Sequence, residues 1–341
     1  MRTRPHTPGP RPALAIVATW ALAALAATPR PAAAQDWFTL DLGTSADLKA
    51  CQKTDFPERY VVGDGGFVAR SAHGSVVTWS MIDVGSTADL RSVHEPLDGE
   101  VWVSGASGEC RRLESAVWNG RDLPATSEVF VLFSRTGAAA YAAGSAGSVY
   151  RTTDGGMNWN LSTTAGAALH DGDGDVTGNA VCVGDAGTIL ATTDGGATWS
   201  PRTSGTAEHL RTYRESSGTA WCAGDNGTLL RSTDAGMTWN AVPSGTTATL
   251  YDIDVSPLDP SRVLAVGAGG TCLLSTDAGL TWCAVESGTA TDLHACDLVT
   301  NTTWLVAGDG GLLRLSVTSG GGCATSAVEP VSWGRIKGTY R

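Results

Sequence analysis

The sequence predicts an all-β fold, a single seven-bladed β-propeller with four-stranded antiparallel blades. One stretch of the 341-residue chain recurs seven times, and the copies align on a glycine that returns every 39 to 43 residues, at Gly63, Gly105, Gly144, Gly184, Gly224, Gly267 and Gly308. Each copy contains four strand-sized apolar stretches separated by turn residues. A Trp-led stretch near Asp36, ahead of the first copy, matches the end of a copy, whereas the seventh copy lacks one.

The first 34 residues have the layout of a secretory signal peptide. Arg2, Arg4 and Arg11 precede an apolar run over residues 13–27, and three alanines at 32–34 form a small-residue cleavage site. The run is shorter than the roughly 20 residues that a membrane helix needs. We expect cleavage, a periplasmic or extracellular location and no stable membrane span afterwards; an uncleaved anchor is the alternative.

Composition limits the classes of function. The chain carries 23 Lys and Arg against 34 Asp and Glu, a formal charge of −11, which argues against a nucleic-acid partner. Only 17% of residues are charged while 42% are hydrophobic, which excludes a coiled coil and a charge-rich disordered chain.

The repeat also predicts the domain boundaries. The propeller spans residues 35–318, and residues 319–341 form a Gly-rich linker with a short tail. The stretch from Asp36 to Leu40 supplies the outer strand of the seventh blade, so the ring closes without a covalent bond and leaves no open sheet edge there. We expect a monomer.

Four copies share a sharper motif between their third and fourth strands, Ser/Thr-x-Asp-x-Gly-x-x-Trp. Its Asp, Gly and Trp positions are Asp154, Gly156, Trp159, Asp194, Gly196, Trp199, Asp234, Gly236, Trp239, Asp277, Gly279 and Trp282. The motif resembles the Asp-box, or bacterial neuraminidase repeat. We expect a structural role, in which the carboxylate binds backbone N–H groups of its own turn and the Trp fills the space between sheets.

The turn between the second and third strands carries an acid in four copies: Asp64, Asp185, Asp225 and Asp309. These turns share one face of a propeller. We therefore predict an acidic rim that binds a partner; the alternative is that Gly-Asp-x-Gly is ordinary turn chemistry.

Alternating acids in the fourth copy suggest a cation site. Asp171, Asp173 and Asp175 alternate with glycines, as in calcium loops. The pattern departs from an EF-hand, because its twelfth position is Cys182. Two interpretations stay open, a flexible acidic turn, which we favour, and a Ca²⁺ site; we expect no other cofactor.

All eight cysteines lie beyond residue 34. Cys51 and Cys296 both lie 12 residues before their glycine, on innermost strands that become neighbours when the ring closes, so they are the first predicted disulfide. Cys272 and Cys283 flank one Asp-box hairpin and are the second. Buried thiols are the alternative.

The repeat, clearest over residues 221–250, resembles the photosystem II assembly and stability factor family. That resemblance implies a non-enzymatic scaffold that binds a protein, here expected in the cell envelope. No catalytic triad, phosphate loop or paired-carboxylate motif stands out, so we predict no enzyme. The alternative function is an Asp-box carbohydrate-active protein that binds or hydrolyses glycans.

Overall fold

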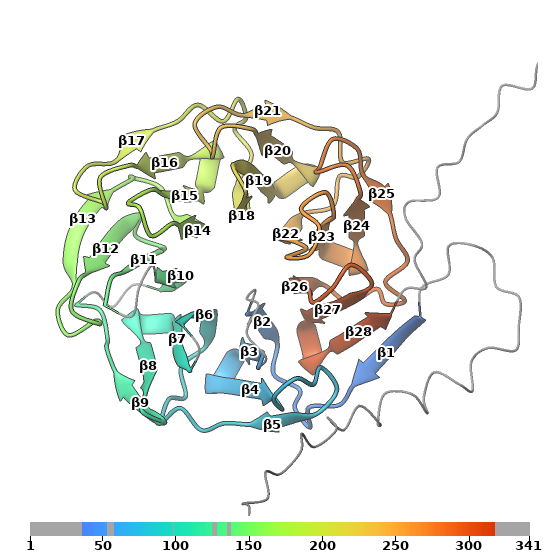
Figure 1. Ribbon diagram of the computed structural model, residues 1–341, viewed down its shortest axis with the longest axis horizontal. Helices are drawn as coiled ribbons and strands as arrows, with labels where there is room; N and C mark the ends of the chain where they lie inside the picture. Colours follow the sequence, from blue (N-terminus) through green and yellow to red (C-terminus); the bar gives the residue numbers. More distant parts are fainter. Residues whose placement is uncertain (1–35, 53–57, 98, 125–127, 135–137, 318–341) are drawn as a thin grey trace, which may run out of the picture. The chain divides into compact units, whose positions relative to one another are not determined.

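The computed structural model describes residues 36–52, 58–97, 99–124, 128–134 and 138–317. Their strands form seven four-stranded antiparallel sheets arranged in a ring (Figure 1). The predicted seven-bladed propeller is thereby confirmed. Among these residues no helix is long and apolar enough to cross a membrane.

Each blade is numbered here by its innermost strand, and its strands run outward in chain order. Blade 1 contains β2 (Leu48–Cys51), β3 (Tyr60–Gly63), β4 (Phe67–Ser71) and β5 (Trp79–Met81), and blade 2 contains β6 (Leu90–Leu97), β7 (Glu100–Gly105), β8 (Cys110–Glu114) and β9 (Val117–Gly120). Blade 3 contains β10 (Val129–Ser134), β11 (Ala140–Gly144), β12 (Ser148–Thr152) and β13 (Asn160–Thr164), and blade 4 contains β14 (Leu169–Gly174), β15 (Ala180–Gly184), β16 (Ile189–Thr192) and β17 (Ser200–Pro201). Blade 5 contains β18 (Leu210–Ser216), β19 (Thr219–Gly224), β20 (Leu229–Ser232) and β21 (Asn240–Ala241). Blade 6 contains β22 (Leu250–Val255), β23 (Val263–Gly267), β24 (Cys272–Ser275) and β25 (Cys283–Ala284). Blade 7 contains β26 (Leu293–Leu298), β27 (Thr303–Gly308), β28 (Leu313–Val317) and β1 (Asp36–Leu40).

Blade 7 is made from both ends of the described chain. β1 pairs antiparallel with β28, with Trp37 opposite Ser316 and Leu40 opposite Leu313. The Trp37 indole packs edge-on against Trp304 and donates a 2.6 Å hydrogen bond to the Glu286 carbonyl of blade 6. The predicted ring closure by the N-terminal strand is confirmed.

Apolar clusters fill the space between neighbouring blades. One cluster contains Leu305 of blade 7 and Val61 of blade 1. The contact between the last and first blades, called the closing seam, is therefore filled with apolar side chains like the other contacts between blades. A buried ion pair crosses the same seam, because Arg59 Nη1 lies 2.7 Å from Asp297 Oδ2.

The repeated glycine is required by a close backbone approach. Gly224 has an extended backbone, with φ −176°, so its conformation alone would accept any residue. A Cβ there would stand 1.9 Å from the His209 carbonyl oxygen, which belongs to the link into the innermost strand. Short 3₁₀ turns follow this glycine in six blades of the described chain: η1 (Asp64–Gly66), η2 (Ala106–Gly108), η3 (Asp185–Gly187), η4 (Asp225–Gly227), η5 (Ala268–Gly270) and η6 (Asp309–Gly311).

The Asp-box turns repeat one hydrogen-bond pattern. In blade 5, Asp234 Oδ1 accepts from the Ser232 hydroxyl at 2.7 Å and from the Thr238 N–H at 2.8 Å, while Oδ2 accepts from the Thr238 hydroxyl at 2.7 Å. Asp154, Asp194 and Asp277 make equivalent bonds in their own turns. These bonds, led by that from Ser232, lower the pKa of Asp234 to about 2.

Both predicted disulfides are wrong. Cys51, Cys272 and Cys296 are buried thiols. Cys51 packs into the cluster between blades 7 and 1, whereas Cys296 packs into the cluster between blades 6 and 7. Positions in the same register point the same way around the ring, so each cysteine faces the preceding blade and the two side chains do not meet.

The second predicted pair, Cys272 and Cys283, does not form because the two residues are not opposite each other in the hairpin. In blade 6, Cys283 lies opposite Leu274, which is two residues after Cys272. The Cys272 carbonyl instead accepts the Val285 N–H at 2.9 Å.

Candidate functional site

A β-bulge interrupts the innermost strand of every blade at the same position. The pairing register skips one residue directly after the first Leu or Val of that strand, for example between Leu48 and Ala50 and between Leu210 and Thr212. A bulge leaves the extra residue unpaired and redirects its side chain. The seven skipped residues, called the inner ring below, are Lys49, Arg91, Phe130, His170, Arg211, Tyr251 and His294.

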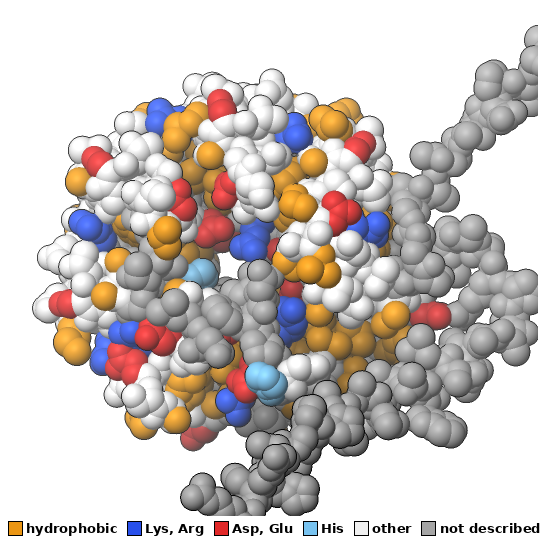
Figure 2. Space-filling view, viewed as in Figure 1, with side chains coloured by type: hydrophobic (Ala, Val, Ile, Leu, Met, Phe, Trp, Pro, Cys, Tyr) orange, Lys and Arg blue, Asp and Glu red, His pale blue; other side chains and the backbone are white. Residues whose placement is uncertain are grey.

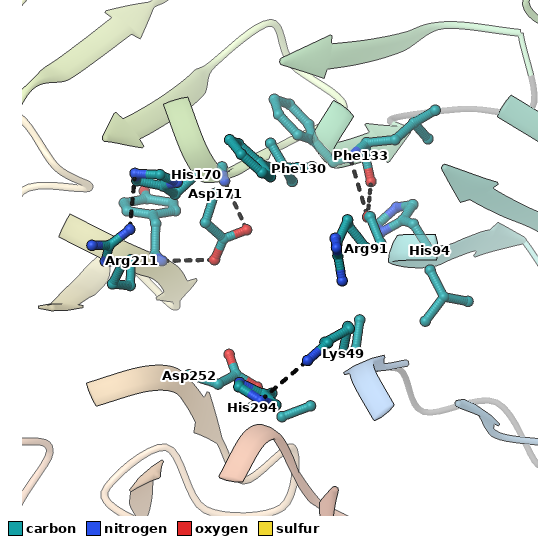
Figure 3. A pocket seen from close by; sticks show the side chains of 18 of the residues that line it. Lys49, Arg91, His94, Phe130, Phe133, His170, Asp171, Arg211, Asp252 and His294 are labelled. Atoms are coloured by element: carbon teal, nitrogen blue, oxygen red, sulfur yellow. Dashed lines mark hydrogen bonds between the residues drawn. The ribbon is translucent and has the colours of Figure 1, made fainter. Parts of the chain in front are cut away.

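The inner ring lines a cavity of about 170 Å³ at the centre of the propeller. Figure 3 shows Lys49, Arg91, Phe130, His170, Arg211 and His294 around this space, each from a different blade. In the space-filling view, acidic, basic and histidine side chains border part of the central opening (Figure 2). The site therefore combines three permanent cations with two imidazoles and two larger aromatic rings.

Carboxylates hold the inner-ring arginines in place. Arg211 Nε and Nη2 lie 2.9 and 2.8 Å from the two oxygens of Asp225, a bidentate geometry. This ion pair lowers the pKa of Asp225. Arg91 donates to Asp64 at 2.7 Å and to Glu128 at 2.9 Å.

The inner-ring histidine His170 also contacts a carboxylate, which it shares with His209, a residue outside the inner ring. Nε2 of His170 and Nδ1 of His209 each lie 2.6 Å from Oδ1 of Asp185. Nε2 of His170 is also 3.2 Å from Arg211 Nη1. Burial and, to a smaller extent, the nearby arginine lower the pKa of His170, against the raising effect of Asp185.

Aromatic side chains flank the histidines. The Phe130 ring centroid lies 5.1 Å from that of His170, and the Tyr251 centroid 5.0 Å from that of His294. Each pair presents ring surface beside a charged group, a combination that suits an amphipathic ligand.

The four predicted rim carboxylates lie at equivalent turns, but each has a cationic or imidazole partner. Asp64 pairs with Arg91, Asp225 with Arg211, and Asp185 with two histidines. Asp309 lies 2.5 Å from His294 Nε2 and 3.4 Å from Lys49 Nζ. Their geometry makes them positioning groups for the inner ring, so the rim is less acidic than the sequence alone indicated.

The three acids of the predicted calcium site do not converge. Residues 169–174 form strand β14, where the sequence suggested a turn. Asp171 Oδ2 accepts the Tyr213 N–H of blade 5 at 2.8 Å, and Asp173 Oδ1 accepts the Gly174 N–H at 2.8 Å. Asp175 accepts the N–H groups of Thr177, at 2.7 Å, and of two further residues of its own turn.

These contacts argue against the calcium alternative. Each carboxylate binds backbone of its own turn or of the neighbouring blade, and the three are not directed at one point. Within the described ranges, no group of three or more His, Cys, Asp or Glu side chains is arranged to hold a metal ion.

The inner ring was missed from the sequence. Its signal was present, since a charged or aromatic residue follows the aligned Leu of the innermost strand in blades 1, 2 and 4 to 7. Strict strand alternation hides it, because the bulge shifts that residue out of the two-residue period.

Comparison with known proteins agrees with this fold. The model of the family described as photosynthesis system II assembly factor YCF48 matches residues 165–289, so the resemblance predicted from the repeat is confirmed there. No curated protein matches the chain.

Solved structures show the same architecture over most of the chain. YCF48 bound to D1 peptide has a TM-score of 0.68 at 19% identity, covering 83% of this chain and 97% of that one. YCF48 from Cyanidioschyzon merolae has a TM-score of 0.65 at 20% identity, covering 82% and 98%. The GH74 xyloglucanase from Xanthomonas campestris has a TM-score of 0.66 at 12% identity, covering 82% of this chain and 53% of that one.

Proposed function

We propose that this protein is a non-enzymatic, exported scaffold that binds a segment of a partner protein in the cell envelope at the inner ring. The observation that carries the proposal is the row of seven bulges, which places one side chain of every blade at a single central site. All seven residues lie outside the strand pairing and are charged or aromatic, so each blade contributes a side chain able to contact a ligand at one place.

The chemistry of the ring defines the segment it fits. Lys49, Arg91 and Arg211 supply cationic donors, and Phe130 and Tyr251 supply apolar ring surface. An extended segment with carboxylates next to an apolar side chain meets both requirements. A similar structure is described as bound to D1 peptide, which supports a peptide ligand for this architecture.

The acids of the site support a non-enzymatic role. Asp171 and Asp252 line the cavity, and each accepts a backbone N–H of the next blade at 2.8 Å, from Tyr213 and Cys296 respectively. Both carboxylates also accept from the Thr212 hydroxyl, at 3.1 and 3.2 Å, so they join three neighbouring inner strands, which supports a structural role for them.

Partner capture tests the proposal. Residues 35–341 are used as bait against the envelope fraction of the native cell, with captured proteins compared by mass spectrometry. The test variant is Arg91→Gln with Arg211→Gln, and the matched control is Arg70→Gln, a partly exposed arginine on β4 that pairs with Glu58. The proposal requires one partner that the wild type and the control retain and the test variant loses.

A second arm separates the other hypotheses. A partner lost only when Asp64, Asp185, Asp225 and Asp309 are changed to Asn, and retained by the arginine variant, would assign binding to the acidic rim instead. Retention of xyloglucan oligosaccharides, with no protein captured, would favour the carbohydrate-active alternative and contradict the scaffold.

A further inference from the structure

Two histidines of the inner ring, His170 and His294, have equivalent surroundings. Each lies beside the acid of its own blade's 3₁₀ turn and beside the inner-ring cation of the next blade around the ring. We propose that this arrangement makes the inner ring pH-sensitive, so that protonation of the two imidazoles tightens the binding of an anionic segment. The inference rests on the function proposed above, because it concerns the regulation of the same site.

The Nε2 atom of His170 lies between two groups with opposite requirements. Asp185 Oδ1, at 2.6 Å, belongs to a carboxylate whose pKa is lowered by hydrogen bonds from histidine against the effect of burial, so it accepts a hydrogen bond. Arg211 Nη1, at 3.2 Å (Figure 3), only donates. A neutral imidazole satisfies one of them at a time, because Nε2 either carries a hydrogen and donates to the acid or carries none and accepts from the arginine.

Blades 7 and 1 repeat this cluster of three groups. Nε2 of His294 lies 2.5 Å from Asp309 Oδ1 and 3.4 Å from Lys49 Nζ, a contact that Figure 3 also marks. Lys49 Nζ is itself 3.4 Å from Asp309 Oδ1. The acid, the imidazole and the cation therefore meet in the same way at two places around one cavity.

Protonation leaves each imidazole with one hydrogen-bonding arrangement. An imidazolium carries hydrogen on both ring nitrogens, so Nε2 donates to the turn acid and repels the neighbouring cation. It no longer accepts from Arg211 or Lys49, so their N–H groups become available to a ligand in the cavity that these residues line. The ring also gains up to two positive charges. Both effects favour a segment that carries carboxylates.

Other charged and titratable groups surround the two imidazoles. In blades 4 and 5 and in blades 6, 7 and 1 they are Asp185, His209, Arg211, Asp225, Asp309, Asp47, Lys49 and Tyr251, with His94 further along the same cavity. The ring of Phe130, which lies beside His170, carries no charge.

The surrounding carboxylates and the tyrosine hold their charge state while an imidazole takes up its proton. A backbone hydrogen bond lowers the pKa of Asp47, and the pair with Arg211 lowers that of Asp225, so both stay ionised in weak acid. Burial raises the pKa of Tyr251, so its hydroxyl stays neutral. Burial also lowers the pKa of His170 below the ordinary value of 6.5, which places its protonation in the weakly acidic range.

Binding of an acidic probe at two pH values tests the proposal. The probe is a peptide of alternating Glu and Phe with a pH-insensitive dye, and fluorescence anisotropy gives its affinity for residues 35–341 at pH 7.5 and pH 5.5. We expect roughly tenfold tighter binding at the lower pH. The variant His170→Gln with His294→Gln should bind with similar affinity at both, whereas the matched control His73→Gln, at an exposed residue after β4, should keep the wild-type ratio. A double variant that keeps the wild-type ratio would assign the effect to His94 or His209 and overturn the proposal.

A titration without ligand separates this proposal from the proposed function. NMR of ¹³C-labelled histidine follows the His170 ring through its protonation. Arg211→Gln removes the neighbouring cation and should raise the pKa of His170, whereas Arg70→Gln, at the partly exposed arginine of β4, should leave it unchanged. A probe that binds at neither pH would contradict the proposed function, and the ring titration would still test the coupling. The same His170 pKa in Arg211→Gln and in the wild type would overturn it.

Discussion

Arg211 and Asp225 form a two-point ion pair, with Nε 2.9 Å from Oδ1 and Nη2 2.8 Å from Oδ2. The arginine comes from the bulge of β18 and the acid from the turn η4 of the same blade. Two features of each repeat, one on the innermost strand and one between the second and third strands, therefore meet at the central site. The pair gives the acid of this turn a structural role, which is to hold the arginine in place.

The Arg211–Asp225 pair predicts a hierarchy of binding defects. Arg211→Gln removes a donor and should weaken partner binding roughly tenfold, whereas Asp225→Asn only loosens the arginine and should weaken it less. The double variant should bind no worse than Arg211→Gln, because both changes act through one group. Titration of the captured partner checks this, and additive losses would show that Asp225 contacts the partner itself.

Acidification should remove the Asp-box contribution to stability. The folded pKa of Asp234, about 2, lies below its ordinary value of 3.8, so its ionised form stabilises the fold above pH 4 and this stabilisation is lost as the pH falls towards 2. At pH 6, Asp234→Ala should lower Tm by roughly 3 °C or more. Melting curves at pH 6, 3 and 2 should show the gap between variant and wild type closing. A constant gap would mean that the carboxylate charge is not what the turn uses.

The same substitution, Gly to Ala, should destabilise the protein to different extents at two positions. In Gly224→Ala the new Cβ would stand 1.9 Å from a backbone oxygen, so the blade must distort, at a cost of about 3 kcal/mol or more. Gly205 has φ +77° but nothing within 4 Å of a Cβ, so Gly205→Ala should cost only about 1 kcal/mol. Urea unfolding of both variants measures the difference, and equal losses would refute the close-approach explanation.

The seam between the first and last blades offers a double-mutant test. Arg59→Met alone removes the ion pair with the buried Asp297 and should destabilise the protein by roughly 3 kcal/mol. Adding Asp297→Leu should recover much of that loss, since an apolar pair of similar volume replaces the ion pair. Chemical denaturation of the two single variants and the double variant gives the coupling energy. A double variant as unstable as the sum of the singles would contradict the account.

Calcium should have no effect on stability through blade 4. Asp171 is committed to the Thr212 hydroxyl and the Tyr213 N–H of blade 5, and Asp175 to its own turn. Millimolar Ca²⁺ or a chelator should therefore leave Tm unchanged. A rise in Tm with Ca²⁺ that Asp173→Asn abolishes would restore the calcium site.

The sequence was sufficient for the architecture but not for side-chain direction. The glycine spacing predicted seven blades, and the Trp-led strand at Trp37, which has no copy of its own, predicted how the ring closes. Both features can be counted along the repeat. Cys51 and Cys296 were placed at the correct register on neighbouring strands, yet register does not say which way around the ring a side chain points. That sense of rotation is a property of the assembled ring.

The candidate site was predicted only in part. The turn acids, such as Asp225, were recognised because turn chemistry is local. Their partners, such as Arg211, were not, because a bulge changes the facing of a single residue and the alternation of apolar residues continues on both sides of it. The same limit applies to Asp171, because its partner Tyr213 lies in the next blade, 42 residues away in sequence.

Site-specific photo-crosslinking in the native cell tests the central claim most directly. A p-benzoylphenylalanine side chain would replace Phe130 in the inner ring and, as the matched control, Met157, which is 71% exposed in an Asp-box turn. The account predicts a light-dependent adduct with one envelope protein from position 130 and none from position 157. An adduct from position 157 alone would place the binding surface in the Asp-box turns and contradict a scaffold that works through its inner ring.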